Sequence, residues 1–375
     1  MQGADVIIVG GGIAGAGAAY EISAFASVVL LERESHCGYH STGRSAASFT
    51  ENYGNSVVRR LAIASRAFLD TPPPDFCEHA LLTPQPVITI ARADQLTLLQ
   101  QQLDQARALV PSIMRIEAAE ALSRVPILRA DYVAGAFVEP HSMEIDVHGL
   151  HQGYLKGARA RGARVVVDAG VTAIERRSEQ WCVTTPAANY AAPLIVNAAG
   201  AWADVIAAMA GVRPLGLVPK RRTAFTVPLP AGLDVRNWPM IDDVAEEFYF
   251  KPDAGRLFVS PADATPSPPL DAYPDDLDVA AGVERLERAT HLNVTRVSRS
   301  WAGLRTFARD ASPVVGLDGA AQGFCWLAGQ GGYGIKTSPA LSRACAALVR
   351  GRSLPQDFAR LGIRADELSP DRLRA

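Results

Sequence analysis

The first 32 residues hold the feature that most constrains the fold, because two apolar segments enclose a glycine-rich turn there. The segment at 6–9 leads into the turn at 10–15, which opens a run of small residues typical of a helix, and a second apolar segment at 28–31 ends in an acid. Strand, turn, helix and strand in this order are typical of the first unit of a doubly wound α/β fold.

Each special position in this unit has a physical task. Gly10 makes the tight turn, Gly12 lets a pyrophosphate approach the backbone at the positive end of a helix, and Gly15 lets that helix pack closely on the strand. Glu32 is placed to accept hydrogen bonds from ribose hydroxyls, and its charge would repel a 2′-phosphate. The pattern predicts an adenine dinucleotide site that disfavours NADP, with NAD and FAD both open.

Length and composition describe a large globular protein. At 375 residues the chain exceeds one compact domain, so roughly two lobes are expected. A formal net charge of -2 gives no basic footprint for nucleic acid, and no apolar run approaches the roughly 20 residues that span a bilayer. We therefore expect neither a nucleic-acid partner nor a transmembrane segment.

The cysteines and the N-terminus favour a cytoplasmic protein. The five cysteines are scattered and odd in number, which argues against a disulfide framework, and the apolar start lacks the basic region of a secretory signal. His36, Cys37 and His40 resemble metal ligands superficially, but no second cluster at metal-site spacing accompanies them. We expect no metal site.

Periodicity predicts a nucleotide-binding lobe that is interrupted twice by a β-rich cap. A helix is expected at 56–69, a charged helical region at 89–122, a helix through 150–158, and a C-terminal helix opened by Ser338-Pro339. The region 213–299 reads as predominantly β, with a hairpin that places Tyr249 on the face opposite Phe248 and Phe250. Further strands are expected at 165–167, 171–174, 181–184, 194–196 and 324–328.

Several blocks in one order resemble the FAD-dependent amine oxidoreductases of the D-amino-acid oxidase, glycine oxidase and sarcosine oxidase group, and most closely the bacterial D-arginine dehydrogenases. They are Gly-Tyr-His-Ser-Thr-Gly-Arg-Ser-Ala-Ala at 38–47, Asn-Ala-Ala-Gly-Ala-Trp at 197–202, Pro-Lys-Arg-Arg at 219–222, Phe-Tyr at 248–249, Trp-Ala-Gly-Leu-Arg at 301–305 and Gln-Gly-Gly-Tyr-Gly-Ile at 330–335. The resemblance implies a discontinuous Rossmann-like FAD-binding domain at 1–85, 146–212 and 300–375. It also implies a β-rich substrate-binding domain at 86–145 and 213–299.

The same resemblance resolves the choice of dinucleotide in favour of noncovalent FAD. The residues expected to bind it are Gly10, Gly12, Ile13, Ala14, Gly15, Glu32, Arg33, Ser41, Thr42, Gly43, Arg44, Ser45, Ala46, Ala47, Val171, Ala199, Gly200, Trp202, Gly303, Arg305, Gly331, Gly332, Tyr333, Gly334, Ile335 and Lys336. Lys336 is expected just before the C-terminal helix, where a cation is unfavourable unless an anion lies close by. A contact with the anionic edge of reduced flavin and a solvated side chain are both open for it.

Oxidation of an amino acid requires a fixed carboxylate, and guanidinium groups bind both of its oxygens at once. By resemblance, Arg222 and Arg305 bind the substrate carboxylate, Tyr249 and Tyr53 donate hydroxyl hydrogen bonds to it, and the carbonyl of Gly332 accepts from the amine. No catalytic base is evident. Desolvation disfavours a charged amine, so a closed cavity itself would promote loss of the amine proton.

The chain departs from the D-arginine dehydrogenases at two pocket positions. Their glutamate that pairs with a distal substrate cation aligns with Val87, and their pocket histidine aligns with Ser48. Because an apolar side chain cannot compensate a buried cation, we expect a preference for neutral or apolar D-amino acids, with Val87 and Met240 as side-chain contacts. The acidic run at 242–247 is interpreted as a solvated loop, although an acid from it would restore a cationic subsite.

The predicted function is FAD-dependent oxidative deamination of D-amino acids, by hydride transfer from Cα to flavin N5 and hydrolysis of the imino acid to a 2-oxo acid and ammonia. One alternative is oxidation of a secondary amine such as sarcosine or proline. Another is an FAD-binding subunit without turnover, which the presence of both arginines and Tyr249 disfavours. The electron acceptor, quinone or oxygen, is left open.

Overall fold

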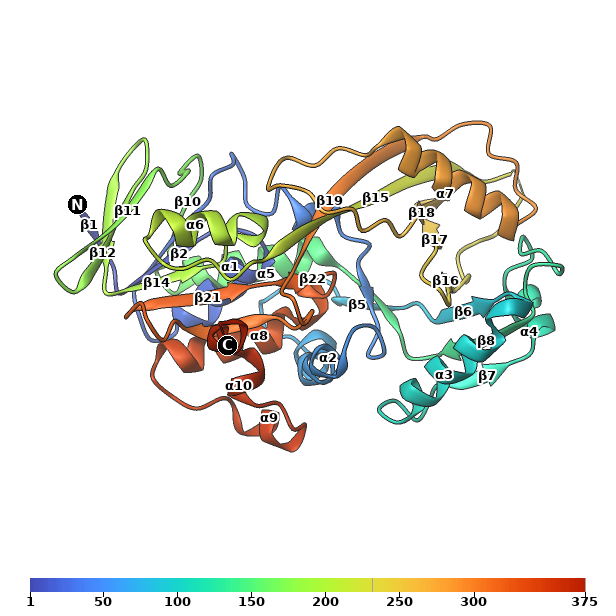
Figure 1. Cartoon of the computed structure of the whole chain (residues 1–375), viewed down its shortest axis with the longest axis horizontal. Helices are drawn as coiled ribbons and strands as arrows, with labels where there is room; N and C mark the ends of the chain where they lie inside the picture. Colours follow the sequence, from blue (N-terminus) through green and yellow to red (C-terminus); the bar gives the residue numbers. More distant parts are fainter. Residues whose placement is uncertain (231, 375) are drawn as a thin grey trace.

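The computed structural model describes residues 1–230 and 232–374, and two groups of elements lie side by side in it (Figure 1). The N-terminus, the C-terminus and a parallel sheet lie on the left of this view, and an extended antiparallel region lies on the right. The long strands β15 and β19 run from the first group into the second. No helix among the described residues is long and apolar enough to cross a bilayer.

A six-stranded sheet forms the centre of the first group. Its order is β10 (Arg164–Val166), β3 (Val28–Leu31), β2 (Val6–Val9), β14 (Leu194–Asn197), β21 (Phe324–Ala328) and β20 (Val314–Leu317), and only β20 is antiparallel to its neighbour. The strands predicted at 6–9, 28–31 and 324–328 are confirmed with these bounds.

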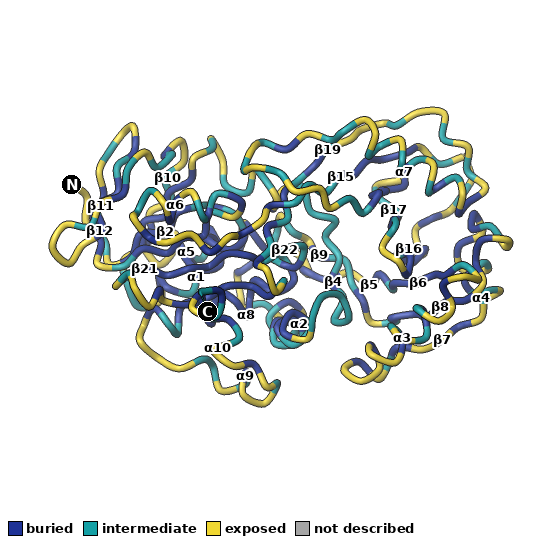
Figure 2. The backbone as a smooth tube through the Cα atoms, in the orientation of Figure 1, coloured by how far each residue is buried: buried dark blue, intermediate teal, exposed yellow. Residues whose placement is uncertain are grey.

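Alternation along these apolar strands fills two separate cores. Ile8 and Leu30 pack against helices on one face, whereas Ile7 and Val29 pack on the other. The first face is covered by α1 (Ile13–Ile22), α5 (Val147–Ala160) and α8 (Gly334–Val349), and α2 (Ser56–Asp70) packs on α8. The strands β2, β3 and β21 are buried along their whole length, and most of the centre of this group is dark blue in Figure 2.

The other face carries a small sheet and a short helix. The sheet has the order β1 (Gln2–Gly3), β13 (Asn189–Ala192), β12 (Gln180–Thr184) and β11 (Ala173–Arg177), and the helix is α6 (Ala203–Met209). The short elements of this half are η1 (Ser41–Arg44), η3 (Gly200–Trp202), α9 (Gln356–Arg360), α10 (Ala365–Leu368) and η4 (Pro370–Leu373). A three-stranded sheet joins β4 (Ser48–Phe49), β9 (Met143–Ile145) and β5 (Leu82–Pro84).

The start of the C-terminal helix corrects the sequence prediction. The helix α8 begins at Gly334, so its opening is not at Ser338-Pro339, and Pro339 lies inside it. A proline inside a helix forgoes one backbone hydrogen bond, which this helix tolerates because it is buried against α1 and α2. Lys336 therefore lies in the first turn of the helix and not before it.

A nine-stranded sheet forms the second group. Its order is β22 (Gln330–Gly331), β19 (Arg299–Phe307), β15 (Val218–Pro228), β18 (Arg256–Ser260), β17 (Tyr249–Asp253), β16 (Met240–Asp243), β6 (Val87–Ala91), β8 (Gly135–Glu139) and β7 (Met114–Ile116). Its helices are η2 (Ala93–Gln95), α3 (Leu96–Arg107), α4 (Ala118–Arg124) and α7 (Asp276–Ala289). The pairing of β15 with β19 continues across residue 300, where a domain boundary is expected.

One sequence prediction in this half needs correction. The region 89–122 is not helical throughout, because it contains part of β6 and all of β7. The region 213–299 is predominantly β, as predicted, and it also contains the helix α7. Both β6 and β7 owe their place to pairing with β8, which lies far along the chain. Such pairing is set by tertiary contacts that a local pattern does not contain.

One face of the nine-stranded sheet carries the polar residues of interest. Tyr249 packs with Val87 and Met240, whereas Phe248 and Phe250 belong to a different core, so the prediction that Tyr249 faces away from them is confirmed. In the register of β15 and β19, Arg222 lies opposite Gly303 and Lys220 lies opposite Arg305. Because side chains alternate along a strand, Arg222 and Arg305 project from the same face.

Candidate active site

A cavity of about 700 Å³ lies between the six-stranded sheet and this face of the nine-stranded sheet. Its lining includes most of the residues expected to bind the cofactor, namely Gly10, Gly12, Ile13, Ala14, Glu32, Arg33, Ser41, Thr42, Arg44, Ser45, Ala46, Val171, Ala199, Gly200, Trp202, Gly303, Arg305, Gly331, Gly332, Gly334 and Ile335. Gly15, Gly43, Ala47, Tyr333 and Lys336 lie outside the lining. Arg222 and Tyr249 line the same cavity, so the expected cofactor and substrate residues share one space.

The glycine turn brings backbone to the edge of this cavity. Gly10 has a φ of 105°, and a Cβ added there would lie 2.5 Å from the carbonyl oxygen of Ala198. A Cβ on Gly15 would lie 1.8 Å from the carbonyl oxygen of Gly10, so the close packing of α1 on β2 requires glycine. At Gly12 the nearest atom would be Thr42 Oγ1 at 3.3 Å, which leaves open backbone beside the start of α1. A pyrophosphate fits this cradle.

Glu32 fixes the far end of the turn. Its Oε2 accepts from the N–H of Gly11 at 2.7 Å and its Oε1 accepts from the N–H of Glu34 at 2.9 Å. The carboxylate is buried and lines the cavity, so its remaining lone pairs are available to accept hydrogen bonds from a ligand bound there.

The lining also includes the segment 168–172, of which only Val171 was expected. This segment follows strand β10 at the carboxyl edge of the parallel sheet, where ligands of such sheets bind. The turn residues Asp-Ala-Gly at 168–170 were the available signal. Phe258 and Gln330 also line the cavity and were not expected.

Arg305 and Arg222 bring two guanidinium groups into the cavity. Arg305 donates from Nη1 to the hydroxyl of Tyr53 at 3.2 Å and from Nη2 to the hydroxyl of Tyr249 at 3.3 Å. The guanidinium carbon of Arg222 lies 6.0 Å from the ring centre of Tyr249, and its buried Nε has no hydrogen-bond partner among the described residues. No carboxylate in the described part of the chain forms an ion pair with either arginine. Half-buried guanidinium groups without a carboxylate partner mark a site for an anionic ligand.

The two tyrosines respond differently to these charges. Burial raises the pKa of Tyr249, but the charges of Arg305 and Arg222 outweigh burial and bring this pKa below its ordinary value. Burial raises the pKa of Tyr53, and the charge of Arg305 opposes this rise only in part. Both hydroxyl oxygens accept from Arg305, so the O–H group of each tyrosine is left to donate to a ligand beside the guanidinium.

Gly332 lies against Arg305 at the end of β22. A Cβ on Gly332 would lie 2.8 Å from Nη1 of Arg305, so a side chain there would displace the guanidinium. Gly332 lines the cavity, and its carbonyl group stays a predicted acceptor for the substrate amine.

The expected specificity residues form a layer behind this face. Val87 and Met240 are register partners on β6 and β16, and both pack with Tyr249 and Phe258. Ser48 is half-buried on β4 opposite Glu144. None of the three lines the enclosed cavity itself, so their contact with a substrate stays a prediction.

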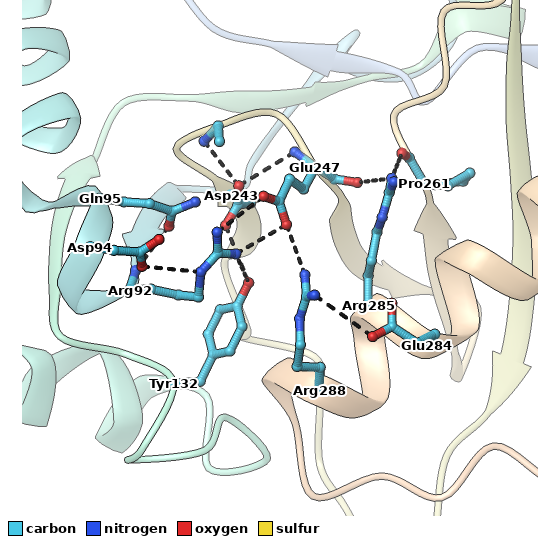
Figure 3. Close-up of polar contacts among 11 residues, drawn as sticks. Arg92, Asp94, Gln95, Tyr132, Asp243, Glu247, Pro261, Glu284, Arg285 and Arg288 are labelled. Atoms are coloured by element: carbon cyan, nitrogen blue, oxygen red, sulfur yellow. Dashed lines mark hydrogen bonds and ion pairs between the residues drawn. The ribbon is translucent and has the colours of Figure 1, made fainter.

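The interpretation of the acidic run 242–247 as a solvated loop is wrong for three of its four acids, since only Glu246 is exposed and Asp242 and Asp243 lie on β16. Asp243 is 1% exposed and accepts from Tyr132 and from the N–H of Ala245, while Glu247 pairs with Arg92 and Arg288 (Figure 3). Arg92 donates to both oxygens of Glu247, at 3.0 and 3.1 Å. These two acids are held in a structural network and are not available to a ligand.

Asp242 is placed differently from its neighbour. In the sheet register it lies opposite Tyr249 on one side and Thr89 on the other, so its side chain shares the face of Tyr249. Burial raises the pKa of Asp242 to about 8, with Glu246 and Asp243 adding to the rise and the charges of Arg222 and Arg305 opposing it. Sequence reasoning left such an acid open without choosing which one, because only the register separates Asp242 from Asp243.

Lys336 is 3% exposed, so a solvated side chain is ruled out. It donates to the carbonyl oxygens of Thr50 and Tyr53, each at 2.7 Å. The expected contact with the flavin stays a prediction.

Comparison with known proteins defines the class. Residues 5–348 match the FAD dependent oxidoreductase (DAO) family, and the chain belongs to this family. It is 25% identical to glycine oxidase of Geobacillus kaustophilus over 373 residues, which cover 95% of each chain. It is 25% identical to the mitochondrial dimethylglycine dehydrogenase of Homo sapiens over 363 residues, which are 88% of this chain and 41% of that protein.

Solved structures confirm the fold. L-proline dehydrogenase from P. horikoshii superposes with a TM-score of 0.84 at 19% identity, over 100% of this chain and 98% of that chain. The predicted α/β fold with a Rossmann-like part is therefore confirmed, as is FAD as the cofactor. The protein is an FAD-dependent oxidoreductase.

Proposed function

We propose that this protein oxidises D-amino acids to imino acids, which hydrolyse to 2-oxo acids and ammonia, and that it favours neutral or apolar side chains. The observation that carries the proposal is the pair Arg222 and Arg305, which face the cavity without an ion pair to any carboxylate of the described residues. An α-carboxylate matches this charge, and the hydroxyls of Tyr53 and Tyr249 lie beside it as donors.

The remaining groups of the site define how a bound amino acid would lie. In this proposal the carboxylate binds the arginines, the amine donates to the Gly332 carbonyl, and the side chain is directed toward Tyr249, behind which Val87 and Met240 pack. Bound FAD supplies the acceptor for the hydride of the substrate Cα. Orientation by fixed groups is the contribution of the chain itself, and exclusion of water from the cavity favours the neutral amine.

Support for the D configuration comes from the sequence blocks shared with D-arginine dehydrogenases, in particular Pro-Lys-Arg-Arg at 219–222 and Trp-Ala-Gly-Leu-Arg at 301–305. Support for an apolar subsite comes from Val87 and Met240, which pack with Tyr249. Asp242 does not oppose it, since a carboxyl group with a pKa of about 8 is mostly neutral at pH 7 and repels no apolar side chain.

A secondary amine is the second candidate. Two relatives are named glycine oxidase and dimethylglycine dehydrogenase, and their names support a small or N-methylated amino acid as the substrate. Such amino acids also carry the carboxylate that the arginines would bind. D-amino acids and secondary amines differ at the amine and at the side chain, so rates measured with both kinds of substrate distinguish the two candidate functions.

The test is anaerobic reduction of the FAD-loaded protein by a panel of D-leucine, D-phenylalanine, D-arginine, L-leucine, glycine and sarcosine, followed by admission of oxygen. We expect the flavin absorbance to bleach with D-leucine and D-phenylalanine at kcat/KM values at least tenfold above the others. Fastest bleaching by sarcosine would establish the secondary-amine alternative, and a clear preference for D-arginine would reject the apolar subsite. No bleaching by any of them would indicate an FAD-binding protein without turnover.

A further inference from the structure

Lys336 is a buried cation at an electrostatically unfavourable place. It lies in the first turn of α8, where the helix dipole is positive, and no carboxylate of the described residues pairs with it. Burial lowers its pKa to about 7, against the favourable charge of Glu139 and with the adverse charge of Arg59. A residue kept at such a position has contacts that offset the unfavourable field.

Those contacts are with one short segment. The Nζ of Lys336 donates to the carbonyl oxygens of Thr50 and Tyr53, both at 2.7 Å, and lies 5.3 Å from the ring centre of Tyr53. Residues 50–55 form the connection between β4 and α2, so they are backbone without a sheet partner of their own. The ammonium group of Lys336 thus supplies hydrogen-bond donors to two backbone carbonyl groups that have no sheet partner.

Glu139 also holds this segment, through different groups of its backbone and side chain. From the end of β8 its Oε2 accepts from the hydroxyl of Thr50 at 2.6 Å and its Oε1 accepts from the N–H of Glu51 at 2.9 Å. Glu139 accepts hydrogen bonds from two donors of the segment, and Lys336 donates hydrogen bonds to two of its carbonyl oxygens. Together they fix the backbone of residues 50–53 between α8 and the nine-stranded sheet.

The segment carries a residue of the candidate site. The hydroxyl of Tyr53 accepts from Nη1 of Arg305 at 3.2 Å, and its ring packs edge-on against Tyr333 with centres 5.1 Å apart. Rotation or withdrawal of the segment would break the contact between Tyr53 and Arg305. Since Lys336 does not line the cavity, its action on a ligand passes through Tyr53.

We propose that Lys336 is a positioning residue, which holds the segment 50–53 so that Tyr53 stays in hydrogen-bond reach of Arg305 and completes the anion subsite. The proposal rests on the proposed function only for the identity of the anion, the carboxylate of an amino acid. It predicts that loss of the ammonium group loosens the segment and weakens carboxylate binding, with little effect on the flavin.

The test compares FAD-loaded Lys336→Met with Lys336→Gln, whose amide keeps neutral donors, and with Lys251→Met as a control. Lys251 is the matched lysine because it is equally buried, at 3% exposure, but pairs with Glu144 and not with the segment. Hydrogen exchange reports the segment directly through the amides of Glu51 and Asn52. We expect exchange there to rise about tenfold in Lys336→Met, to recover in large part in Lys336→Gln, and to stay unchanged in Lys251→Met.

Ligand binding gives the second readout. We titrate 4-methyl-2-oxopentanoate, the 2-oxo acid expected from D-leucine, and follow the flavin spectrum. Its Kd and the KM for D-leucine should rise about tenfold in Lys336→Met, with a smaller change in kcat. In a double-mutant cycle, Lys336→Met should cost little more in a Tyr53→Phe background, because both changes remove the same contact.

Unchanged exchange at Glu51 and Asn52 in Lys336→Met would overturn the proposal, as would full additivity of the two substitutions in binding. A shifted flavin reduction potential with an unmoved segment would instead support the contact with flavin. If the parent protein turns over no amino acid, the proposed function fails, while exchange still decides the role of Lys336.

Discussion

Arg221 and Arg222 are neighbours on β15, yet their side chains lie on opposite faces of the sheet. Arg221 donates to Asp278 at 2.7 Å and to Asp275 at 3.3 Å, so its charge is compensated outside the cavity. Arg222 faces the cavity, and its buried Nε has no partner among the described residues. Arginine therefore has a structural role at position 221, whereas the arginine at position 222 is available to a ligand.

This contrast predicts the effect of Arg222→Met. A charge-assisted hydrogen bond to a carboxylate contributes roughly 3 kcal/mol, and each 1.4 kcal/mol is about tenfold, so kcat/KM for D-leucine should fall about 100-fold. The measurement is steady-state kinetics of the FAD-loaded protein. Arg221→Met is the control and should change kcat/KM by less than about threefold. Equal losses in both variants would contradict a carboxylate role for Arg222.

Asp242 gives a prediction about pH and stability. Its pKa is about 8 in the folded protein and near 3.8 in an unfolded chain, so the folded state holds the extra proton between these values. Its contribution to the free energy of unfolding is complete below about pH 4 and is lost as the pH rises toward 8. Asp242→Asn has no titrating carboxyl group and removes this loss. The melting temperature of the variant relative to that of the parent should therefore be higher at pH 8.5 than at pH 5. A difference that is the same at both pH values would show that Asp242 is not a buried acid.

At the scale of elements, the parts that follow from local pattern were predictable. The strands at 6–9 and 28–31 are continuous apolar runs between turn residues, and the hairpin at 249–260 has its own turn chemistry. The strands β6 and β7 were missed because they are short and lie beside the longer helical pattern of α3. Their identity depends on partners far along the chain, which periodicity does not describe.

The candidate site divides in the same way. Residues in distinctive blocks, such as Arg305 and Gly332, were found because those blocks resemble the sequences of a known family, and both residues line one cavity. The separate roles of Asp242 and Asp243 were not predictable, since adjacent residues of one strand point to opposite faces and the register decides which face is the site. The partners of Lys336 also lie about 280 positions away along the chain, at Thr50 and Tyr53.

The packing of α1 on β2 leads to a prediction for Gly15→Ala. The new Cβ would lie 1.8 Å from the carbonyl oxygen of Gly10, so the helix must move away from the turn, at a cost of about 3 kcal/mol. We expect a lower melting temperature and loss of most bound FAD on purification, measured by the ratio of flavin to protein absorbance. Gly3→Ala is the control, because its Cβ would meet nothing within 4 Å. Full retention of FAD in Gly15→Ala would contradict the geometry of this turn.

At the scale of the whole molecule, residues from both large sheets line the same cavity. The turn at Gly10 and Gly12 belongs to the six-stranded sheet, whereas Arg222 and Tyr249 belong to the nine-stranded sheet, and all of them line one space. A dinucleotide that fills this space contacts both groups of elements. Its binding free energy therefore stabilises the arrangement of the two sheets and not only the first one.

Removal of FAD tests this coupling. At a ligand concentration of 100 Kd, binding to the native state alone adds about 2.7 kcal/mol to the free energy of unfolding, so FAD should raise the melting temperature of the apoprotein. Hydrogen exchange should slow both in Val6–Val9 of β2 and in Tyr249–Asp253 of β17, because each sheet loses freedom when the cavity fills. Riboflavin at the same concentration is the control. It lacks the pyrophosphate and adenosine that the glycine turn and Glu32 would hold, so it should produce a much smaller shift. Slower exchange confined to β2 would mean that the cofactor stabilises one sheet only, and that the cavity does not couple the two.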